Sequence, residues 1–103
     1  MALDVALLDE RGRPGAGVQI RVDPHVRLMV LVGELQLPLL HRMKDYYRDA
    51  DFAASELGEL LEEVRIALER SHGDAELVEF LSGLQHLATT AISEGVGLAV
   101  IAD

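Results

Sequence analysis

Residues 54–93, ASELGELLEEVRIALERSHGDAELVEFLSGLQHLATTAIS, decide the fold of this chain. Leucine, valine and phenylalanine recur every three or four residues on both sides of a central glycine. This spacing places apolar side chains on one face of an α-helix. We therefore predict helices over residues 54–71 and 75–93, with a turn at Gly73 and with Asp74 capping the second helix. Their facing apolar stripes predict an antiparallel helical hairpin.

Strands are expected on both sides of this hairpin in the sequence. Residues 3–7 and 18–22 place an apolar side chain at every second position, which predicts two strands of an antiparallel pair. Residues 9–17 between them contain three glycines and a proline and are expected to form a loop. Residues 98–102, LAVIA, are apolar without alternation, so we predict a central strand that is buried on both faces.

The segment at residues 24–32 has two interpretations. Asp23 and Pro24 are typical of a helix start, and a helix ending at Gly33 would place Val26, Met29 and Val30 on one side. The high content of β-branched residues leaves a strand open as the alternative.

Residues 38–49 are expected to form a further helix, which begins at Pro38. In that helix Tyr46 and Tyr47 share the apolar face, and the charged side chains lie opposite. Packing in the core is the first interpretation of the two rings. The alternative places them at the edge of the core, where one could contact a ligand.

These elements predict a single α+β domain over residues 1–103, with a small, mostly antiparallel sheet of about three strands packed against three to four helices. The sheet would consist of the N-terminal hairpin and the C-terminal strand. The chain has no cysteine, which excludes a disulfide framework and thiolate chemistry. Its first residues lack the pattern of an export signal, and its longest apolar run is far too short to cross a bilayer. We expect a cytoplasmic protein.

The net charge of −9 is distributed unevenly. Residues 1–48 contain six acidic and seven basic side chains, whereas residues 49–103 contain twelve acidic side chains against Arg65 and Arg70. An acidic field repels nucleic acid and anionic lipid and attracts basic partners. The alternative is that the charge serves only solubility.

The predicted helix over 54–71 gathers glutamates away from its apolar stripe. Ile66 is expected opposite the stripe, with carboxylates around it, and such a surface could dock a basic protein. The alternative is a solvated helix face. The predicted partner-binding residues are Glu59, Glu62, Glu63 and Ile66, with Asp49 and Asp51 at the edge.

The sequence contains little evidence for a metal site or a catalytic site. The four histidines do not have the spacing of zinc ligands. His41, Asp45 and Asp49 follow one another at intervals of four and could share a metal, but ordinary ion pairs explain this spacing better. We expect no metal and no cofactor. An enzyme is disfavoured because most acidic side chains fall on outer helix faces, and Tyr47, His41 and Asp45 form the group to test if there is one.

Two stretches carry a resemblance to a known kind of protein. PLLHRMKDYYRDADF at residues 38–52 and VIAD at residues 100–103 resemble small bacterial proteins similar to the immunity proteins encoded beside secreted toxins. The resemblance implies a cytoplasmic, non-catalytic protein that neutralises a toxin by covering its active site or a nearby surface.

Three functional hypotheses follow. The first is a non-enzymatic inhibitor, an immunity protein whose acidic helix surface docks a basic toxin domain. The second is a small-ligand-binding or enzymatic domain that uses Tyr46, Tyr47 and His41. The third is a homodimeric structural subunit, which would expose an apolar patch on residues 24–32 or an open edge of the sheet.

Overall fold

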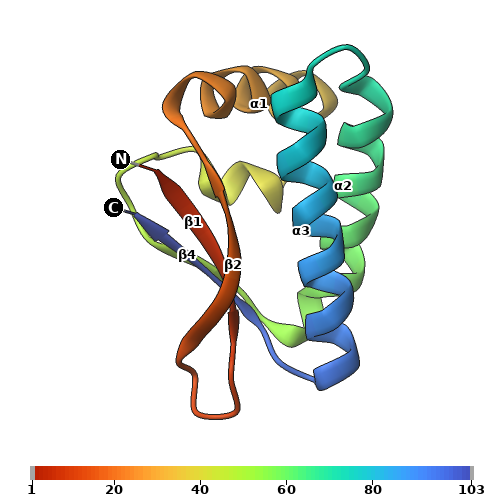
Figure 1. Cartoon of the computed structure of the whole chain (residues 1–103). Helices are drawn as coiled ribbons and strands as arrows, with labels where there is room; N and C mark the ends of the chain where they lie inside the picture. The colour runs from red at the N-terminus through yellow and green to blue at the C-terminus, as the bar shows by residue number, and fades with distance from the viewer. Residues whose placement is uncertain (1, 103) are drawn as a thin grey trace.

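Residues 2–102, which the computed structural model describes, form a four-stranded sheet and three α-helices (Figure 1). In chain order the elements are β1 (Leu3–Leu8), β2 (Pro14–Ile20), α1 (Val22–Leu35), the 3₁₀ turn η1 (Leu40–Met43), β3 (Ala50–Phe52), the 3₁₀ turn η2 (Ala54–Glu56), α2 (Leu57–Arg70), α3 (Ala75–Glu94) and β4 (Leu98–Ala102). The predicted α+β class is confirmed.

The sheet has the strand order β2-β1-β4-β3, and every neighbouring pair is antiparallel. β1 pairs along its length with β4, from Leu3 opposite Ala102 to Leu7 opposite Leu98. The N-terminal hairpin and the central position of the C-terminal strand are therefore as predicted. β2 and β3 are the two edge strands, and β3 is the additional strand that the sequence did not indicate.

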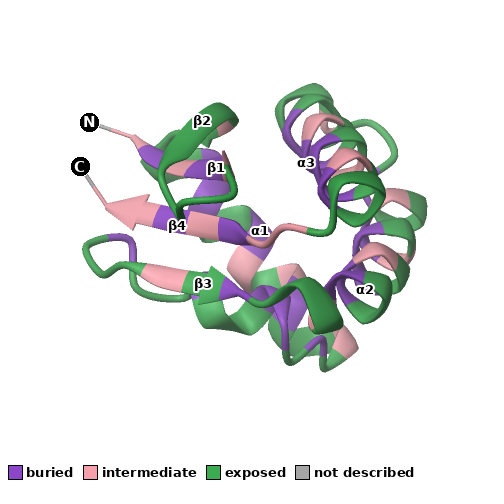
Figure 2. Ribbon diagram, turned by 90° about the horizontal axis from the view of Figure 1, so that it is seen from below, coloured by how far each residue is buried: buried purple, intermediate pink, exposed green. Residues whose placement is uncertain are grey.

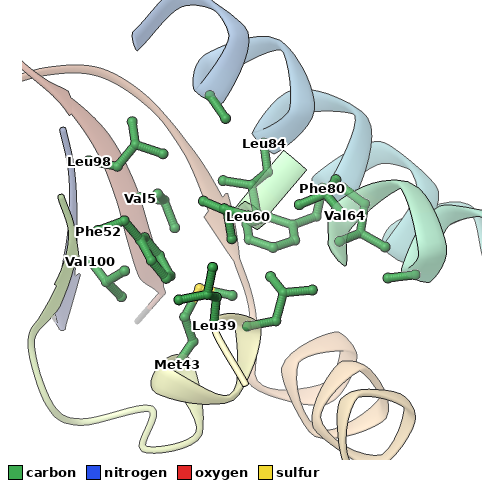
Figure 3. Packing of buried hydrophobic residues seen from close by; sticks show 14 of the residues in the cluster. Val5, Leu39, Met43, Phe52, Leu60, Val64, Phe80, Leu84, Leu98 and Val100 are labelled. Carbon is green, nitrogen blue, oxygen red and sulfur yellow. The ribbon is translucent and has the colours of Figure 1, made fainter. Parts of the chain in front are cut away.

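Helices α2 and α3 lie on one face of the sheet, and α1 closes one end of the layer between them (Figures 1 and 2). Alternation along the strands directs Leu3, Val5 and Val100 toward these helices, where all three side chains are buried. Between sheet and helices lies one apolar core, in which Phe52, Leu60 and Leu84 meet (Figure 3). Among the described residues, no helix packs on the opposite face of the sheet.

The helical hairpin forms as predicted, because periodicity and end signals agree there. Asp74 caps α3 by accepting the backbone N–H of Leu77 at 3.3 Å. Gly73 has φ +86 in the preceding turn, and Gly95 has φ +70 at the C-terminal end of α3, both in the left-handed region that favours glycine.

The predicted helix over residues 38–49 is wrong. Only the 3₁₀ turn η1 forms there, because side-chain hydrogen bonds, one local and the others to distant residues, hold the backbone in a different course. The carboxylate of Asp45 accepts the N–H of Tyr47 at 2.9 Å, and Asp49 accepts the N–H of Ala102 on β4 at 2.8 Å. The chain then extends into β3, where Phe52 is buried opposite Leu98.

The segment at 24–32 is helical, as the first interpretation had it, but α1 is longer than predicted. It begins at Val22 and continues through Gly33 to Leu35, ending where Gln36 takes a left-handed conformation at φ 55. Its buried residues are Pro24, His25, Leu28 and Val32. The side that carries Val26 and Val30 faces solvent instead.

Two predictions about strands need correction. The loop between the first two strands is shorter than residues 9–17, because Pro14–Gly17 already belong to β2. β4 is not buried on both faces: Leu98 and Val100 are buried, whereas Ala99 and Ile101 on the outer face are only half-buried.

Candidate functional site

One glutamate of the acidic flank expected on α2 is turned toward the core. With 100° between successive residues, the buried side of α2 lies about 50° from the predicted stripe, toward Glu63 and Ala67. Glu63 is consequently only 8% exposed, and its two carboxylate oxygens accept the N–H groups of Leu39 at 3.1 Å and Leu40 at 2.9 Å. Glu63 is therefore a structural residue that holds η1, and its assignment to a docking surface is wrong.

The remaining glutamates of this flank are largely paired with arginines of the chain. Arg65 binds Glu62 and, at 2.7 Å, Glu69. The hydrogen bond from Arg65 lowers the pKa of Glu62. Arg42 binds Glu56 in the same way and lowers the pKa of Glu56 to about 2. These pairs neutralise much of the charge that was expected to attract a basic partner.

Four predicted contact residues lie elsewhere or have no ion-pair partner among the described residues. Ile66 is half-buried and packs against the core, not at the centre of an exposed patch. Asp49 is engaged at the end of β4 through Ala102. Glu59 and Asp51 are exposed, and the described residues offer neither of them an ion pair. The predicted set therefore does not form one continuous surface.

The structure places the two tyrosines of the second hypothesis in different environments. Tyr46 is buried, its hydroxyl donates to the carbonyl of Ile20 at 3.3 Å, and its ring meets the ring of His25 at 5.0 Å. Nε2 of His25 lies 2.6 Å from the carbonyl oxygen of Met43. Tyr47, predicted to share the buried face, is instead 68% exposed. Within residues 2–102 no three potential metal ligands come together.

A groove of about 900 Å³ follows the free edge of β2, where β2 faces the first turns of α3. It continues around the edge onto the outer face of the sheet. The lining residues that matter here are Asp4, Gly15, Gln19, Glu76, Glu79 and Phe80. A second, smaller groove at the tip of the β1–β2 hairpin is lined by Asp9, Glu10, Arg11, Arg13, Glu94 and Val96. His41, Tyr46 and Tyr47 line neither groove.

The edge strand itself is unprotected. The sequence of β2, PGAGVQI, contains no charged residue, and Pro14 to Gly17 are exposed (Figure 2). An edge strand directs half of its backbone N–H and C=O groups away from the sheet, and proteins commonly block such an edge with lysine or another charge. β2 is therefore open to pairing with an additional strand.

Two glycines fix the position of β2. A Cβ at Gly17 would overlap the carbonyl oxygen of Val5 on β1, so the strand needs glycine there. A Cβ at Gly83 on α3 would lie 2.7 Å from a methyl group of Val18, so helix and strand approach closely at this point. By contrast, a Cβ at Gly15 would make only an ordinary contact, 3.6 Å from the carbonyl oxygen of Leu7.

Carboxylates dominate the electrostatics of the groove. Asp4, Glu76 and Glu79 line it together with one guanidinium, that of Arg21. Glu76 is paired with Arg27 at 3.0 Å, whereas no ion pair within the described residues involves Asp4 or Glu79. Oδ1 of Asp4 is buried and accepts no hydrogen bond from residues 2–102. Such an oxygen is costly until a donor reaches it.

The sequence interpretation missed this groove because residues 14–17 were assigned to a loop. One available signal was the uncharged run from Pro14 to Ile20, in a chain of which 26% is charged. A second was the alternation of Val18 and Ile20, because a strand that contains these two residues can begin among the preceding glycines.

In the part of the chain that the structure describes, no helix is long and apolar enough to traverse a membrane. Comparison of the chain with models of known protein families, with curated proteins and with solved structures finds no match. The similarity to immunity proteins thus stays a prediction that rests on residues 38–52 and 100–103.

Proposed function

We propose that this chain is a non-enzymatic binding protein that docks a basic protein partner. The observation that carries the proposal is the carboxylate-lined groove along the uncovered edge of β2. The site of docking therefore differs from the α2 flank that the sequence suggested. An immunity protein acting on a toxin domain is the role that the resemblance implies, and a basic toxin segment is a partner of the required chemistry.

The geometry favours strand addition as the mode of binding. An extended segment can pair its backbone with the free edge of β2, and its side chains then alternate between the two sides of the sheet. On one side they would meet Glu79 and Phe80 of α3, and on the other Asp4 and Gln19. A lysine or arginine on the first side would supply a donor for Glu79, and a donor on the second side would reach the unpaired oxygen of Asp4.

The opposing charges should make binding sensitive to salt. Charges exposed in an open groove are screened over about 8 Å at physiological ionic strength. The net charge of −9 would also speed the encounter with a basic partner.

The experiment uses a short capped peptide of alternating lysine and valine, with a peptide of alternating glutamate and valine as the control probe. Binding is followed by amide chemical shifts and by hydrogen exchange of β2. We expect the lysine peptide alone to shift and protect the amides of Gly15–Gln19, with weaker binding as salt rises. Equal binding of both peptides, or shifts centred on α2, would reject the groove.

A glycine substitution gives a matched pair of variants. Gly15→Lys places a positive charge on the edge without a steric clash, so it should abolish binding of the lysine peptide. Gly58→Lys makes the same change on α2, where a Cβ meets nothing within 4 Å, and should leave binding unchanged. Loss of binding in both variants would show that net charge alone controls the interaction.

A further inference from the structure

The outer side of α1 carries an apolar stripe that the fold does not use. Val22, Val26 and Val30 follow one another at single-turn intervals and are 48%, 55% and 58% exposed. With 100° per residue, the three side chains fall within about 80° of arc. Met29 is half-buried beside them, and Gly33 continues the same line. Helices that pack one face on a core normally present a polar face to water.

Tyr47 is connected to the beginning of α1 through Tyr46. Its ring contacts that of Tyr46 at 5.6 Å, and the hydroxyl of Tyr46 reaches Ile20, two residues before α1. Tyr47 and the three valines are four of the six large hydrophobic side chains that are most exposed in the described chain. The exposed large apolar side chains of the described residues are therefore concentrated on α1 and next to it.

The charge distribution favours a second copy as the occupant. Residues 1–48 carry six acidic and seven basic side chains, whereas the rest of the chain is strongly acidic. Two copies that met through α2 or α3 would bring like charges together. α1 belongs to the nearly neutral part, so two copies can approach through it without this repulsion.

We propose that α1 packs antiparallel against α1 of a second copy, about a twofold axis that passes beside Val26. Val26 then meets Val26 of the other chain, and Val22 meets Val30. The same flank of each helix faces its counterpart. In this register Asp23 lies within two residues, about 3 Å along the axis, of Arg27 of the other chain, whose guanidinium also binds Asp74 and Glu76 of its own chain.

The dimer is expected to be weak. α1 has 14 residues and is therefore about 21 Å long, so the contact is smaller than a standard protein interface. Association should depend on concentration. The α1 surface is separate from the free edge of β2, so this inference stands independently of the binding function proposed above.

Sedimentation velocity over a wide range of concentrations tests the association. The wild type should shift from the mass of one chain toward that of two as concentration rises. Val26→Asp should weaken association by at least about tenfold, because it replaces the central apolar pair with two like charges. Ile92→Asp on α3, a position that is 46% exposed, is the matched control and should associate like the wild type. A wild type that stays monomeric, or equal loss in both variants, overturns the inference.

Single cysteines test the orientation, since the chain has none of its own. Disulfide formation requires Cα atoms within about 7 Å. Val26→Cys should cross-link to itself under mild oxidation, and Val22→Cys should cross-link only with Val30→Cys. Ile92→Cys sets the background rate. Self-cross-linking of Val22→Cys would show a parallel pair, and cross-linking of Val26→Cys at the background rate would show no pair; either result refutes the arrangement.

Two variants test peptide binding at β2 and dimerisation through α1 independently of each other. Gly15→Lys should abolish peptide binding and leave sedimentation unchanged, whereas Val26→Asp should do the reverse. Circular dichroism of each variant confirms that the fold is retained.

Discussion

Removing the buried carboxylate of Glu63 should destabilise the domain far more than removing an exposed carboxylate on the same helix. Glu63 accepts two backbone N–H groups on separate oxygens, from residues whose side chains are buried: Leu39 is 6% exposed and Leu40 is fully buried. In Glu63→Gln the amide oxygen can still accept one of these groups. The amide nitrogen would face the other N–H, leaving one buried donor without an acceptor.

The magnitude follows from the hydrogen bond that is lost. A hydrogen bond to a charged group contributes about 1.5–3 kcal/mol, so Glu63→Gln should cost about 2–3 kcal/mol. A domain of this length has a stability of about 5–15 kcal/mol, so the loss is a large fraction of the total. The melting temperature should fall by about 10–20 °C. Glu63→Ala leaves both donors unpaired and should cost about 4 kcal/mol.

Urea unfolding followed by circular dichroism measures the difference in free energy. Hydrogen exchange adds a local readout, because the amides of Leu39 and Leu40 should lose protection before the core does. Glu62→Gln is the control: Glu62 is exposed and paired with Arg65, so the unfolding midpoint should hardly change. If Glu63→Gln and Glu62→Gln unfolded at the same urea concentration, the structural role of Glu63 would be refuted.

Three further predictions concern stability. Gly17→Ala should lower the melting temperature because its Cβ overlaps the carbonyl oxygen of Val5, whereas Gly15→Ala should leave it nearly unchanged; calorimetry of both variants separates the two sites. Phe52→Ala should cost about 3–5 kcal/mol in urea unfolding, because the ring is 1% exposed in the core, and a cost under about 1 kcal/mol would contradict the placement of β3. The pKa of Glu56 is lowered from 4.5 to about 2, so its contribution to stability is complete above pH 4.5 and disappears as the pH falls toward 2. Glu56→Gln should therefore be less stable than the wild type at neutral pH and match it near pH 2, and a difference that persisted in acid would argue against the ion pair with Arg42.

The sequence predicted the parts of the fold that local patterns determine. The helices α2 and α3 follow from the spacing of their leucines, and their connection follows from Gly73 and Asp74. The central position of β4 also followed from its apolar composition. In each case the residues that specify the element are neighbours in the chain.

The errors occur where distant residues decide the local structure. The apolar residues of 38–49 have the spacing of a helix. The backbone at the start of η1 is instead fixed by hydrogen bonds to Glu63, more than 20 positions away in sequence. The burial of Glu63 could not be read from α2 alone, because the apolar stripe is about 100° wide and does not fix the direction of the core to within the observed offset of about 50°. β3 has three residues, too few to show a period.

The candidate site was predicted only in outline. The acidic character of the chain and the possibility of an exposed apolar patch on residues 24–32 were visible in the composition. Which carboxylates remain available was not visible, because Arg42 and Arg65 select their partners through the tertiary structure. The edge position of β2 depends on strand order, which no local pattern encodes.

The close contact between Gly83 and Val18 links the helical layer to the edge strand. A Cβ at position 83 would force Val18 or the backbone of one element to shift, unless position 18 became smaller at the same time. The two positions should therefore tolerate changes only as a pair: Gly83→Ala should be rescued by Val18→Ala. A substitution at Gly83, which does not line the groove, would also alter the width of the cleft beside β2, so it should change the affinity for the strand proposed to bind there.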